Sequence, residues 1–574
     1  MGVFAADFET TVDKDDCRVW AYSLCEICEP FQTFYGKTID ELMEYIKTTN
    51  NTLYFHNLKF DGEFILYWLH EHGYEHVKDR KELKPKTYTT LISDRGVWYT
   101  MKICHDKRGK RLITTTIIDS LKILNFTVEQ IAEAFNLPIR KLSIDYNAYR
   151  EVGHELTQEE ADYVCNDVRI VAMALKHLFD EGLNKMTQGS NALADYKKIT
   201  GVKWREWFPV LDTEQDTLIR MSYKGGFTYL SPRFKGKLIG NVSVFDVNSL
   251  YPSQMMYRLL PYGVPIEFEG KYPGIDGYPL YTVRFSCIFE LKENHIPTVQ
   301  IKHNPRFVET EYLTSSGGDY VTLTMTNVDL ELFLEHYNVY NIEWYGGFAF
   351  KAQKGMFDAY INKWMKVKEE STLNGNKAMR TLAKLMLNAL YGKFGLRIDC
   401  RSKYPYFDEE GLLHYHKGPE EQREPIYIPV ATFITAWARY TTITAAQKVY
   451  DRFIYADTDS LHLVGHEIPE NLEVDKTKLG AWDYELHADQ AKYIRQKTYM
   501  EHPCGKDAED YKKKQPELYE MCHGWKITCA GMPKSCYSQV TIDNFEEEST
   551  FDGKLRPSHV KGGIVLEDTT FTIR

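Results

Sequence analysis

Paired carboxylates recur in this chain at spacings that can bring them to one point. In the segment Tyr455-Ala-Asp457-Thr-Asp459-Ser460, a strand would place Asp457 and Asp459 on the same face, because side chains alternate with a period of two. Neighbouring carboxylates repel each other, and this repulsion is tolerated where divalent cations lie between them and a phosphate-bearing substrate. Taken alone, the segment is more typical of an Asp-Thr-Asp-Ser turn, so the interpretation depends on the rest of the chain.

Two further segments supply groups that suit the same chemistry. A β-branched run from Val242 ends at Asp246, which predicts a strand that delivers a third carboxylate. Lys384, Asn388 and Tyr391 fall at i, i+4 and i+7 of a predicted helix whose other face is apolar. A solvated helix face would carry similar charges, but this row also suits a helix that offers charges to phosphates and a ring to a base.

A second carboxylate centre is predicted near the N-terminus. A predicted strand carries Asp7 and Glu9 on one face, Asp61 follows an apolar run, and Tyr163 lies four residues before Asp167 on a predicted helix. Four such carboxylates could hold two metal ions about 4 Å apart, which activate a water molecule and stabilise the leaving oxygen of a phosphodiester. Each motif is weak by itself, and their order along the chain strengthens the interpretation.

The elements that position these groups can be outlined from the same patterns. Residues 357–394 predict two antiparallel helices with a turn at Asn374-Gly375-Asn376. The runs 403–407 and 412–416 predict a β-hairpin. Glycine and proline are frequent from residue 257 to 355, which indicates an α/β insertion with loops, and the tail from Cys529 is predicted to be β-rich.

Composition bounds the class of protein. The 574 residues predict about two to four domains, and no apolar run of about 18 residues or signal peptide is apparent. The net charge of -11 argues superficially against a nucleic-acid partner. Basic residues nevertheless cluster locally, as in the segment 377–397. Eleven irregularly placed cysteines favour reduced thiols over a disulfide framework.

At this point a family resemblance is plain. The segments 246–252, 384–392 and 455–459 resemble motifs A, B and C of family B DNA polymerases, in the same order and at matching spacing. The N-terminal carboxylates resemble the ExoI, ExoII and ExoIII motifs of proofreading 3'-5' exonucleases. Over nearly its whole length the chain resembles the protein-primed polymerases of small, phi29-like bacteriophages.

The resemblance implies a multidomain α+β and α/β fold. A ribonuclease-H-like 3'-5' exonuclease domain would precede a right-hand polymerase with palm, fingers, thumb and two terminal-protein-region insertions. The implied boundaries are 1–187 for the exonuclease domain, 188–256 and 426–528 for the two parts of the palm, 257–355 and 395–425 for the first and second insertions, 356–394 for the fingers and 529–574 for the thumb.

The implied function is DNA-directed DNA synthesis that replicates a linear phage genome by protein-primed, processive, strand-displacing synthesis with proofreading. Three alternatives were open at this stage. A nuclease or repair enzyme with a polymerase-shaped DNA clamp is disfavoured by the intact motif carboxylates together with Lys368 and Lys384, and a non-catalytic scaffold would not need two carboxylate centres. An RNA-copying polymerase is disfavoured by Tyr251 and by the proofreading module.

The resemblance also implies roles for individual residues. Two Mg²⁺ ions at each site would be held in the polymerase by Asp246, the backbone carbonyl of Val247, Asp457 and Asp459, and in the exonuclease by Asp7, Glu9, Asp61 and Asp167. Mn²⁺ would be able to substitute for Mg²⁺. Lys141 would lie near the scissile phosphate with Tyr163 among the catalytic groups. The incoming nucleotide would be bound by Tyr251, which excludes a 2' hydroxyl, and by Lys368, Lys384, Asn388 and Tyr391.

Further residues are implied to contact DNA. The frayed primer end would be held by Thr10, His56, Asn57, Phe60, Ser120, Leu121 and Tyr146, and the duplex by Ser249, Arg439, Lys497 and Tyr499. Tyr223-Lys224-Gly225-Gly226 resembles a YxGG motif whose glycines let the backbone approach DNA. The alternatives are core packing for Phe60 and an ordinary tight turn for the glycines.

The implied partners follow from this function. They are template and primer DNA, deoxynucleoside triphosphates, a terminal protein that serves as primer, and single-stranded and double-stranded DNA-binding replication proteins. No membrane partner is expected. The chain would act in the cytoplasm of the bacterial host as a monomer or as a heterodimer with terminal protein.

Overall fold

The computed structural model describes residues 2–145, 148–301 and 311–574, and the expected DNA contact Tyr146 lies outside these residues. The N-terminal part is built on an eight-stranded sheet in the order β3-β2-β1-β4-β8-β7-β6-β5, with β1 parallel to β4 and antiparallel to β2. Its strands are β1 (Gly2–Thr10), β2 (Val19–Glu26), β3 (Thr33–Gly36), β4 (Asn51–Phe55), β5 (Glu75–His76), β6 (Thr87–Ile92), β7 (Trp98–Arg108) and β8 (Arg111–Asp119). Its helices are α1 (Ile39–Ile46), α2 (Leu58–Glu71), α3 (Val128–Ala134) and α4 (Gln158–Asp180). Helix α4 packs on β1 and β2, so the carboxylates of β1 and α4 face each other.

A second sheet of seven strands, in the order β23-β22-β21-β10-β20-β19-β9, forms the palm. Its strands are β9 (Thr228–Leu230), β10 (Leu238–Val247), β19 (Phe453–Asp457), β20 (Ser460–Val464), β21 (Trp482–Arg495), β22 (Thr498–Pro503) and β23 (Lys526–Cys529). The helices of this part are α8 (Leu250–Tyr257), α13 (Ile428–Lys448), α14 (Gly505–Lys514) and α15 (Pro516–Met521). Asp246 and Asp457 both pair with Ser460, so their carboxylates lie at one edge of the sheet.

The predicted helix pair is present as α10 (Asp358–Leu373) and α11 (Lys377–Ala389), followed by the short α12 (Tyr391–Phe394). The connection falls at residues 374–376, as predicted. On α11 the residues Leu382, Ala383, Met386 and Leu387 are buried while Lys384 and Asn388 are exposed, which confirms the amphipathic pattern. The helices α5 (Gln188–Thr200), α6 (Lys203–Trp207) and α7 (Thr213–Arg220) precede the palm strands, and α5 packs on α11.

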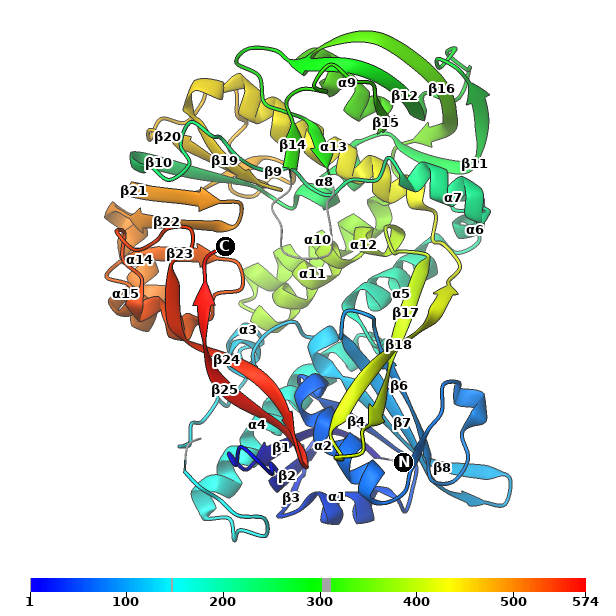
Figure 1. The fold of residues 1–574 in the computed structure, drawn as a ribbon, viewed down its shortest axis with the longest axis vertical. Coiled ribbons are helices and arrows are strands. Elements are labelled where there is room, and N and C mark those ends of the chain that lie inside the picture. The colour runs from blue at the N-terminus through cyan, green and yellow to red at the C-terminus, as the bar shows by residue number, and fades with distance from the viewer. Residues whose placement is uncertain (1, 146–147, 302–310) are drawn as a thin grey trace.

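The segment 257–355 contains a four-stranded sheet in the order β11-β16-β12-β15 with one helix, which agrees with the predicted α/β insertion. Its elements are β11 (Leu260–Glu269), β12 (Leu280–Leu291), β13 (Val299–Ile301), β14 (Glu311–Leu313), β15 (Val321–Thr326), α9 (Asn327–His336) and β16 (Tyr337–Gln353). This sheet lies at the end of the molecule opposite the N-terminal domain (Figure 1).

Two long hairpins connect the halves of the molecule. The first consists of β17 (Asp399–Phe407) and β18 (Leu413–Gln422), and its strands are longer than the two predicted runs. The second consists of β24 (Thr550–Val560) and β25 (Gly563–Thr572). Figure 1 shows both hairpins descending toward the N-terminal domain, where their tips reach the region of α2.

A helix that spans a bilayer needs about 20 predominantly apolar residues. No helix within residues 2–145, 148–301 and 311–574 is long and apolar enough to do so.

Candidate active sites

A tight hairpin brings the palm carboxylates together. Strand β19 ends at Asp457 and β20 begins at Ser460, so Thr458 and Asp459 form the connection. Thr458 adopts φ +64°, and its N–H donates to the Phe227 carbonyl over 2.6 Å. The chain therefore reverses between Asp457 and Asp459, so the strand interpretation of this segment was wrong and the turn that the sequence also suggested is what forms. The reversal still keeps the two residues adjacent, since the Asp459 N–H donates to the Asp457 carbonyl over 2.7 Å.

The three palm carboxylates influence each other electrostatically. Burial, followed by the charges of Asp459 and Glu485, raises the pKa of Asp246 to about 7. Burial and the charge of Asp457 also raise the pKa of Asp459. Asp457 Oδ1 accepts a hydrogen bond from Thr228 Oγ1 and lies 3.1 Å from Lys497 Nζ. This edge of the sheet therefore concentrates negative charge that a divalent cation would neutralise.

The N-terminal domain holds a second carboxylate cluster. Asp7 and Glu9 lie on β1 and Asp167 lies on α4, as the sequence predicted, whereas Asp61 lies in the first turn of α2, for which no helix was predicted. Burial and the charge of Asp167 raise the pKa of Asp7 to about 7. Burial and the charge of Asp7 raise the pKa values of both Glu9 and Asp61. The Asp167 carboxylate contacts Lys141 Nζ, whose charge opposes the effect of burial on the pKa of Asp167.

The N-terminal cluster has the donor chemistry that a divalent cation requires. Asp167 Oδ1 is buried, and no hydrogen-bond partner for it occurs among the described residues. Such an oxygen costs free energy unless it is satisfied, and a cation would satisfy it. The donors are all carboxylate oxygens, the ligands that Mg²⁺ and Mn²⁺ prefer. Within the described ranges, no three acidic, His or Cys side chains already converge closely enough to form a complete metal site.

Cationic side chains gather on the helix pair α10 and α11. Lys368 on α10 lies near Arg380 and Lys384 on α11, and burial together with the charge of Arg380 lowers the pKa values of both lysines. Such mutual repulsion favours binding of a polyanion. The rings of Tyr251 and Tyr391 stack with centroids 4.0 Å apart, so these two predicted nucleotide contacts do come together.

Comparisons with known proteins decide the family. The family model described as "DNA polymerase type B, organellar and viral" matches residues 42–155 and 144–478. The chain belongs to the type B DNA polymerases. It is 48% identical to the DNA polymerase of Bacillus phage Nf over all of this chain and 99% of the relative, and 47% identical to that of Bacillus phage phi29 with the same coverage. The polymerase of Streptococcus phage Cp-1 is 32% identical over all of this chain and 98% of the relative.

Solved structures agree with this assignment. Phi29 DNA polymerase superposes with a TM-score of 0.93 and 44% identity, covering all of both chains. A complex of phi29 DNA polymerase with primer-template DNA and incoming nucleotide substrates has a TM-score of 0.92 and 46% identity, again over all of both chains. The chain is thus a phi29-like phage DNA polymerase with a proofreading exonuclease domain. Its family also implies a divalent metal.

Two acidic residues at the polymerase site were missed by sequence reasoning. Glu485 on β21 raises the pKa values of both Asp246 and Asp459, and Asp483 on the same strand pairs with Asp246. The signal was present in the sequence, because Asp483-Tyr-Glu485 repeats the spacing of Asp7-Phe-Glu9 in a strand. Thr228, which donates to Asp457, carried no comparable signal.

The second glycine of the YxGG motif has a structural reason of its own, beside the predicted approach to DNA. A Cβ added at Gly226 would lie 2.7 Å from both Thr458 Oγ1 and Cγ2. Gly226 thus permits the segment 223–226 to pass closely over the β19–β20 hairpin, and the predicted approach of its backbone to DNA stays a prediction. A Cβ at Gly225 would meet nothing within 4 Å.

We expect Gly226→Ala to impair synthesis selectively. The added methyl group would displace Thr458 and with it the turn that positions Asp459, so the rate of nucleotide addition should fall by about ten- to a hundredfold. Single-turnover extension of a primed template measures this rate. Gly225→Ala is the matched control and should stay within about threefold of wild type, and equal loss in both variants would contradict the explanation.

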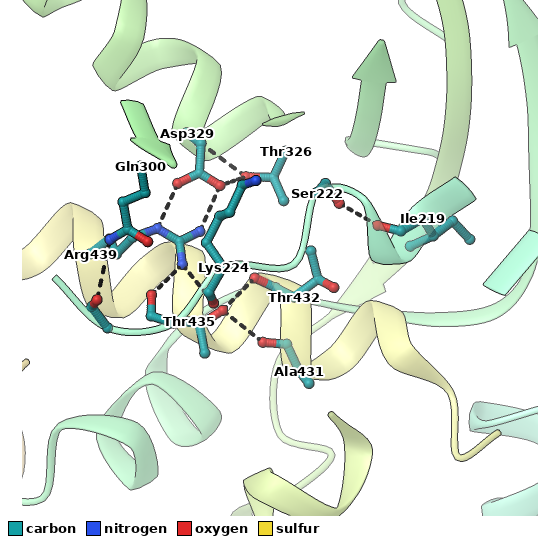
Figure 2. A network of polar contacts seen from close by, with 12 residues as sticks. Ile219, Ser222, Lys224, Gln300, Thr326, Asp329, Ala431, Thr432, Thr435 and Arg439 are labelled. Carbon is teal, nitrogen blue, oxygen red and sulfur yellow. Dashed lines mark hydrogen bonds and ion pairs between the residues drawn. The ribbon is translucent and has the colours of Figure 1, made fainter. Parts of the chain in front are cut away.

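The predicted DNA contact of Arg439 is corrected by the structure. Its side chain is 2% exposed and donates to both carboxylate oxygens of Asp329 over 2.9 and 2.7 Å (Figure 2). The remaining donors reach the carbonyls of Lys224 and Gly225 over 3.0 and 2.7 Å. All of its described partners belong to the protein itself. Arg439 therefore positions the YxGG linker, residues 223–226, and does not bind a phosphate of the DNA.

The other predicted DNA contacts of the polymerase half are accessible to different degrees. Ser249 begins α8 with φ +55° and is half-buried. Lys497 is exposed, whereas the ring of Tyr499 packs against Tyr455 at 5.3 Å. Burial raises the pKa of Tyr223 to about 12, so its phenol stays protonated.

The predicted contacts of the exonuclease half divide into two groups. Asn57 is exposed, and Thr10, Phe60 and Leu121 are half-buried, so these residues remain candidates for binding a strand. Ser120 is completely buried and donates to the Phe55 carbonyl, so its predicted DNA contact is wrong. His56 bonds Ser120 Oγ and the Phe126 carbonyl over 3.0 and 2.7 Å, and these bonds fix the loop that precedes α2.

A capping network fixes the start of α4, which carries Tyr163 and Asp167. Glu160 accepts from the Thr157 N–H and pairs with Arg150 and His154. Burial opposes ionisation of Glu160, but these donors outweigh it and lower its pKa from 4.5 to about 2.

We expect this network to stabilise the fold in a pH-dependent manner. A carboxyl group whose pKa is lowered by folding stabilises the protein at pH values above the pKa that it has in the unfolded chain. This contribution is lost as the pH falls through the pKa that it has in the folded protein. Glu160→Gln should therefore reduce the free energy of unfolding by about 1–3 kcal/mol at pH 7. Denaturant unfolding of both proteins between pH 7 and pH 3 should show this difference shrinking below about pH 4.5, whereas a difference that does not change with pH would contradict the account.

Proposed function

We propose that this polymerase copies DNA by two-metal phosphoryl transfer, removes misincorporated nucleotides in its N-terminal domain, and starts synthesis on a protein hydroxyl. The observation that carries the proposal is the coexistence of two carboxylate clusters in one chain. The palm cluster lies in the same chain as the clustered lysines of α10 and α11, and the N-terminal cluster contains an Asp167 oxygen for which the described residues supply no hydrogen-bond partner. One cluster thus suits a triphosphate and the other a phosphodiester.

In the palm, two Mg²⁺ ions would be held by Asp246, Asp459 and the carbonyl of Val247, with Asp457 alongside. When bound, the ions lower the pKa of the primer 3' hydroxyl and neutralise charge on the leaving pyrophosphate. Lys368 and Lys384 bind the triphosphate. The Tyr251 ring, stacked on Tyr391, supports the sugar and leaves no room for a 2' hydroxyl.

In the N-terminal domain the metal ligands would be Asp7, Glu9, Asp61 and Asp167. Lys141 contacts both Asp167 and the ring of Tyr163, which lies 5.6 Å from its ammonium group. This arrangement keeps a positive charge beside the scissile phosphate. Asn57 and Phe60, at the start of α2, would hold the frayed primer end.

The proposal includes the substrates and partners of the phi29-like enzymes. Solved relatives bind primer-template DNA and incoming nucleotides, and the same ligands are proposed here. The terminal protein would dock on the insertion 257–355 and on the hairpin within 395–425. The enzyme would work as a monomer, or as a heterodimer with terminal protein, in the cytoplasm of a bacterial host alongside DNA-binding replication proteins.

A primed single-stranded circle tests the proposal. Wild-type protein with Mg²⁺ and deoxynucleotides should produce strands longer than one circle, and without nucleotides it should degrade the primer. Failure to extend the primer, with degradation intact, would overturn the polymerase assignment and leave an exonuclease. Priming is tested separately by covalent transfer of a labelled nucleotide to a purified terminal protein.

A further inference from the structure

The tips of the two long hairpins meet on helix α2 at a single buried carboxylate. Glu63 is 2% exposed and, with Asp61, is one of two buried carboxyl groups on a helix whose other buried side chains are mostly apolar. Tyr415 on β18 donates its hydroxyl to Glu63 Oε2 over 2.9 Å. His559 on β24 places Nε2 3.5 Å from the same oxygen. Three segments that lie far apart in the sequence therefore meet at one atom.

The surrounding contacts attach each hairpin to the N-terminal domain. On one side the Phe407 ring stacks on His70 with centroids 3.9 Å apart and meets the edge of Tyr67. On the other side the Lys561 carbonyl accepts from the Cys17 N–H over 2.9 Å. The two hairpins also touch each other, because the rings of Tyr415 and His559 lie 6.1 Å apart. Figure 1 shows the two tips converging on α2 from opposite sides.

The burial of Glu63 requires an explanation because a buried carboxylate is unfavourable without partners. Among the described residues, its hydrogen-bond and ionic partners come from the two hairpins and not from its own domain. The cation side chains of Lys59, Arg95 and Lys403 line a cavity of about 220 Å³ at the same junction. Separation of either hairpin from α2 would thus leave Glu63 short of a partner, which favours the closed arrangement.

We propose that Glu63 is a positioning residue that closes both hairpins on the N-terminal domain, so that palm, hairpins and α2 form a continuous ring around bound DNA. This inference rests on the proposed function, since it concerns how long the polymerase stays on its template. The carboxylate does not take part in the chemical step. It determines how many nucleotides are added before the ring opens and the DNA leaves.

Product length per binding event tests the role of Glu63. Wild type, Glu63→Ala and Tyr415→Phe extend a labelled primer on a single-stranded circle, with excess unlabelled primed DNA added at the start as a trap. Glu63→Ala should shorten the products about five- to tenfold. Tyr415→Phe removes the hydroxyl but keeps the packing of the aromatic side chain, so it should shorten them about two- to threefold. The rate of adding the first nucleotide without a trap should be unchanged. Glu44→Ala, which alters an exposed carboxylate on α1, is the matched control.

Retention on circular and linear templates separates ring closure from a general loss of stability. A closed ring slides off a linear template but must open to leave a circle, so wild type should dissociate more slowly from the circle. Glu63→Ala should lose most of this difference. If Glu63→Ala had the product lengths and retention of wild type, the inference would be overturned and the proposed function would stand. If wild type did not extend the primer, the proposed function would be overturned instead. A slowing of the first nucleotide addition in Glu63→Ala as large as the shortening of its products would also contradict the inference.

Discussion

Asp459→Asn is expected to abolish primer extension. The substitution preserves the shape of the side chain and both backbone hydrogen bonds of Asp459, to Asp457 and from Val247. It removes a negative charge that a divalent cation needs, so the rate of extension should fall by at least about a thousandfold. Rapid-quench measurement of single-nucleotide addition determines the loss. Primer degradation without nucleotides should continue at the wild-type rate.

The same preparation supplies the control for this prediction. Because the exonuclease carboxylates lie in a separate domain on β1, α2 and α4, intact degradation would show that Asp459→Asn is folded. Extension within about tenfold of wild type would mean that Asp459 is not a metal ligand. Loss of both activities would indicate a folding defect and argue against two independent sites.

Asp7→Asn should have the converse effect. The carboxylate interacts with Asp167, Glu9 and Asp61 in one cluster, and its neutralisation would weaken metal binding to all of them. Degradation of a 5'-labelled single strand should fall about a thousandfold, while correct nucleotide addition should remain within about twofold. Mismatched primer ends should then persist.

An exposed residue of the same type provides the comparison for Asp7. Asp13 lies in the loop after β1 and is exposed, so Asp13→Asn should degrade the strand like wild type. If Asp7→Asn retained more than about a tenth of the degradation rate, the two-metal interpretation of this cluster would fail. If it also lost extension, the two sites would not be independent.

The chemistry of both sites could be predicted from the sequence to the extent that it follows local periodicity. Asp7 and Glu9 alternate in a strand, and the polar row of α11 repeats every three to four residues. The sequence left a strand and a turn both open at Thr458, and the positive φ of this β-branched residue could not be predicted because such residues rarely adopt it. Tertiary hydrogen bonds hold it, since the Thr458 N–H donates to the Phe227 carbonyl and Thr442 Oγ1 donates to the Thr458 carbonyl.

Residues whose partners are distant in the sequence were the least predictable. Arg439 was expected at the DNA because it is a cation in a motif, yet its partner Asp329 lies 110 residues away. Ser120 is buried by packing that no local pattern reveals. Glu485 is different, since its spacing repeated a pattern already used for Asp7 and Glu9.

The buried pair of Arg439 and Asp329 has a consequence for engineering. Asp329 belongs to α9 of the insertion, whereas Arg439 belongs to α13 and also holds the linker carbonyls of Lys224 and Gly225. A chimera that exchanged residues 257–355 for a segment without this aspartate would leave an uncompensated buried charge, at a cost of about 3–5 kcal/mol. The insertion is therefore not an interchangeable cassette, and grafts must carry the acidic residue with them.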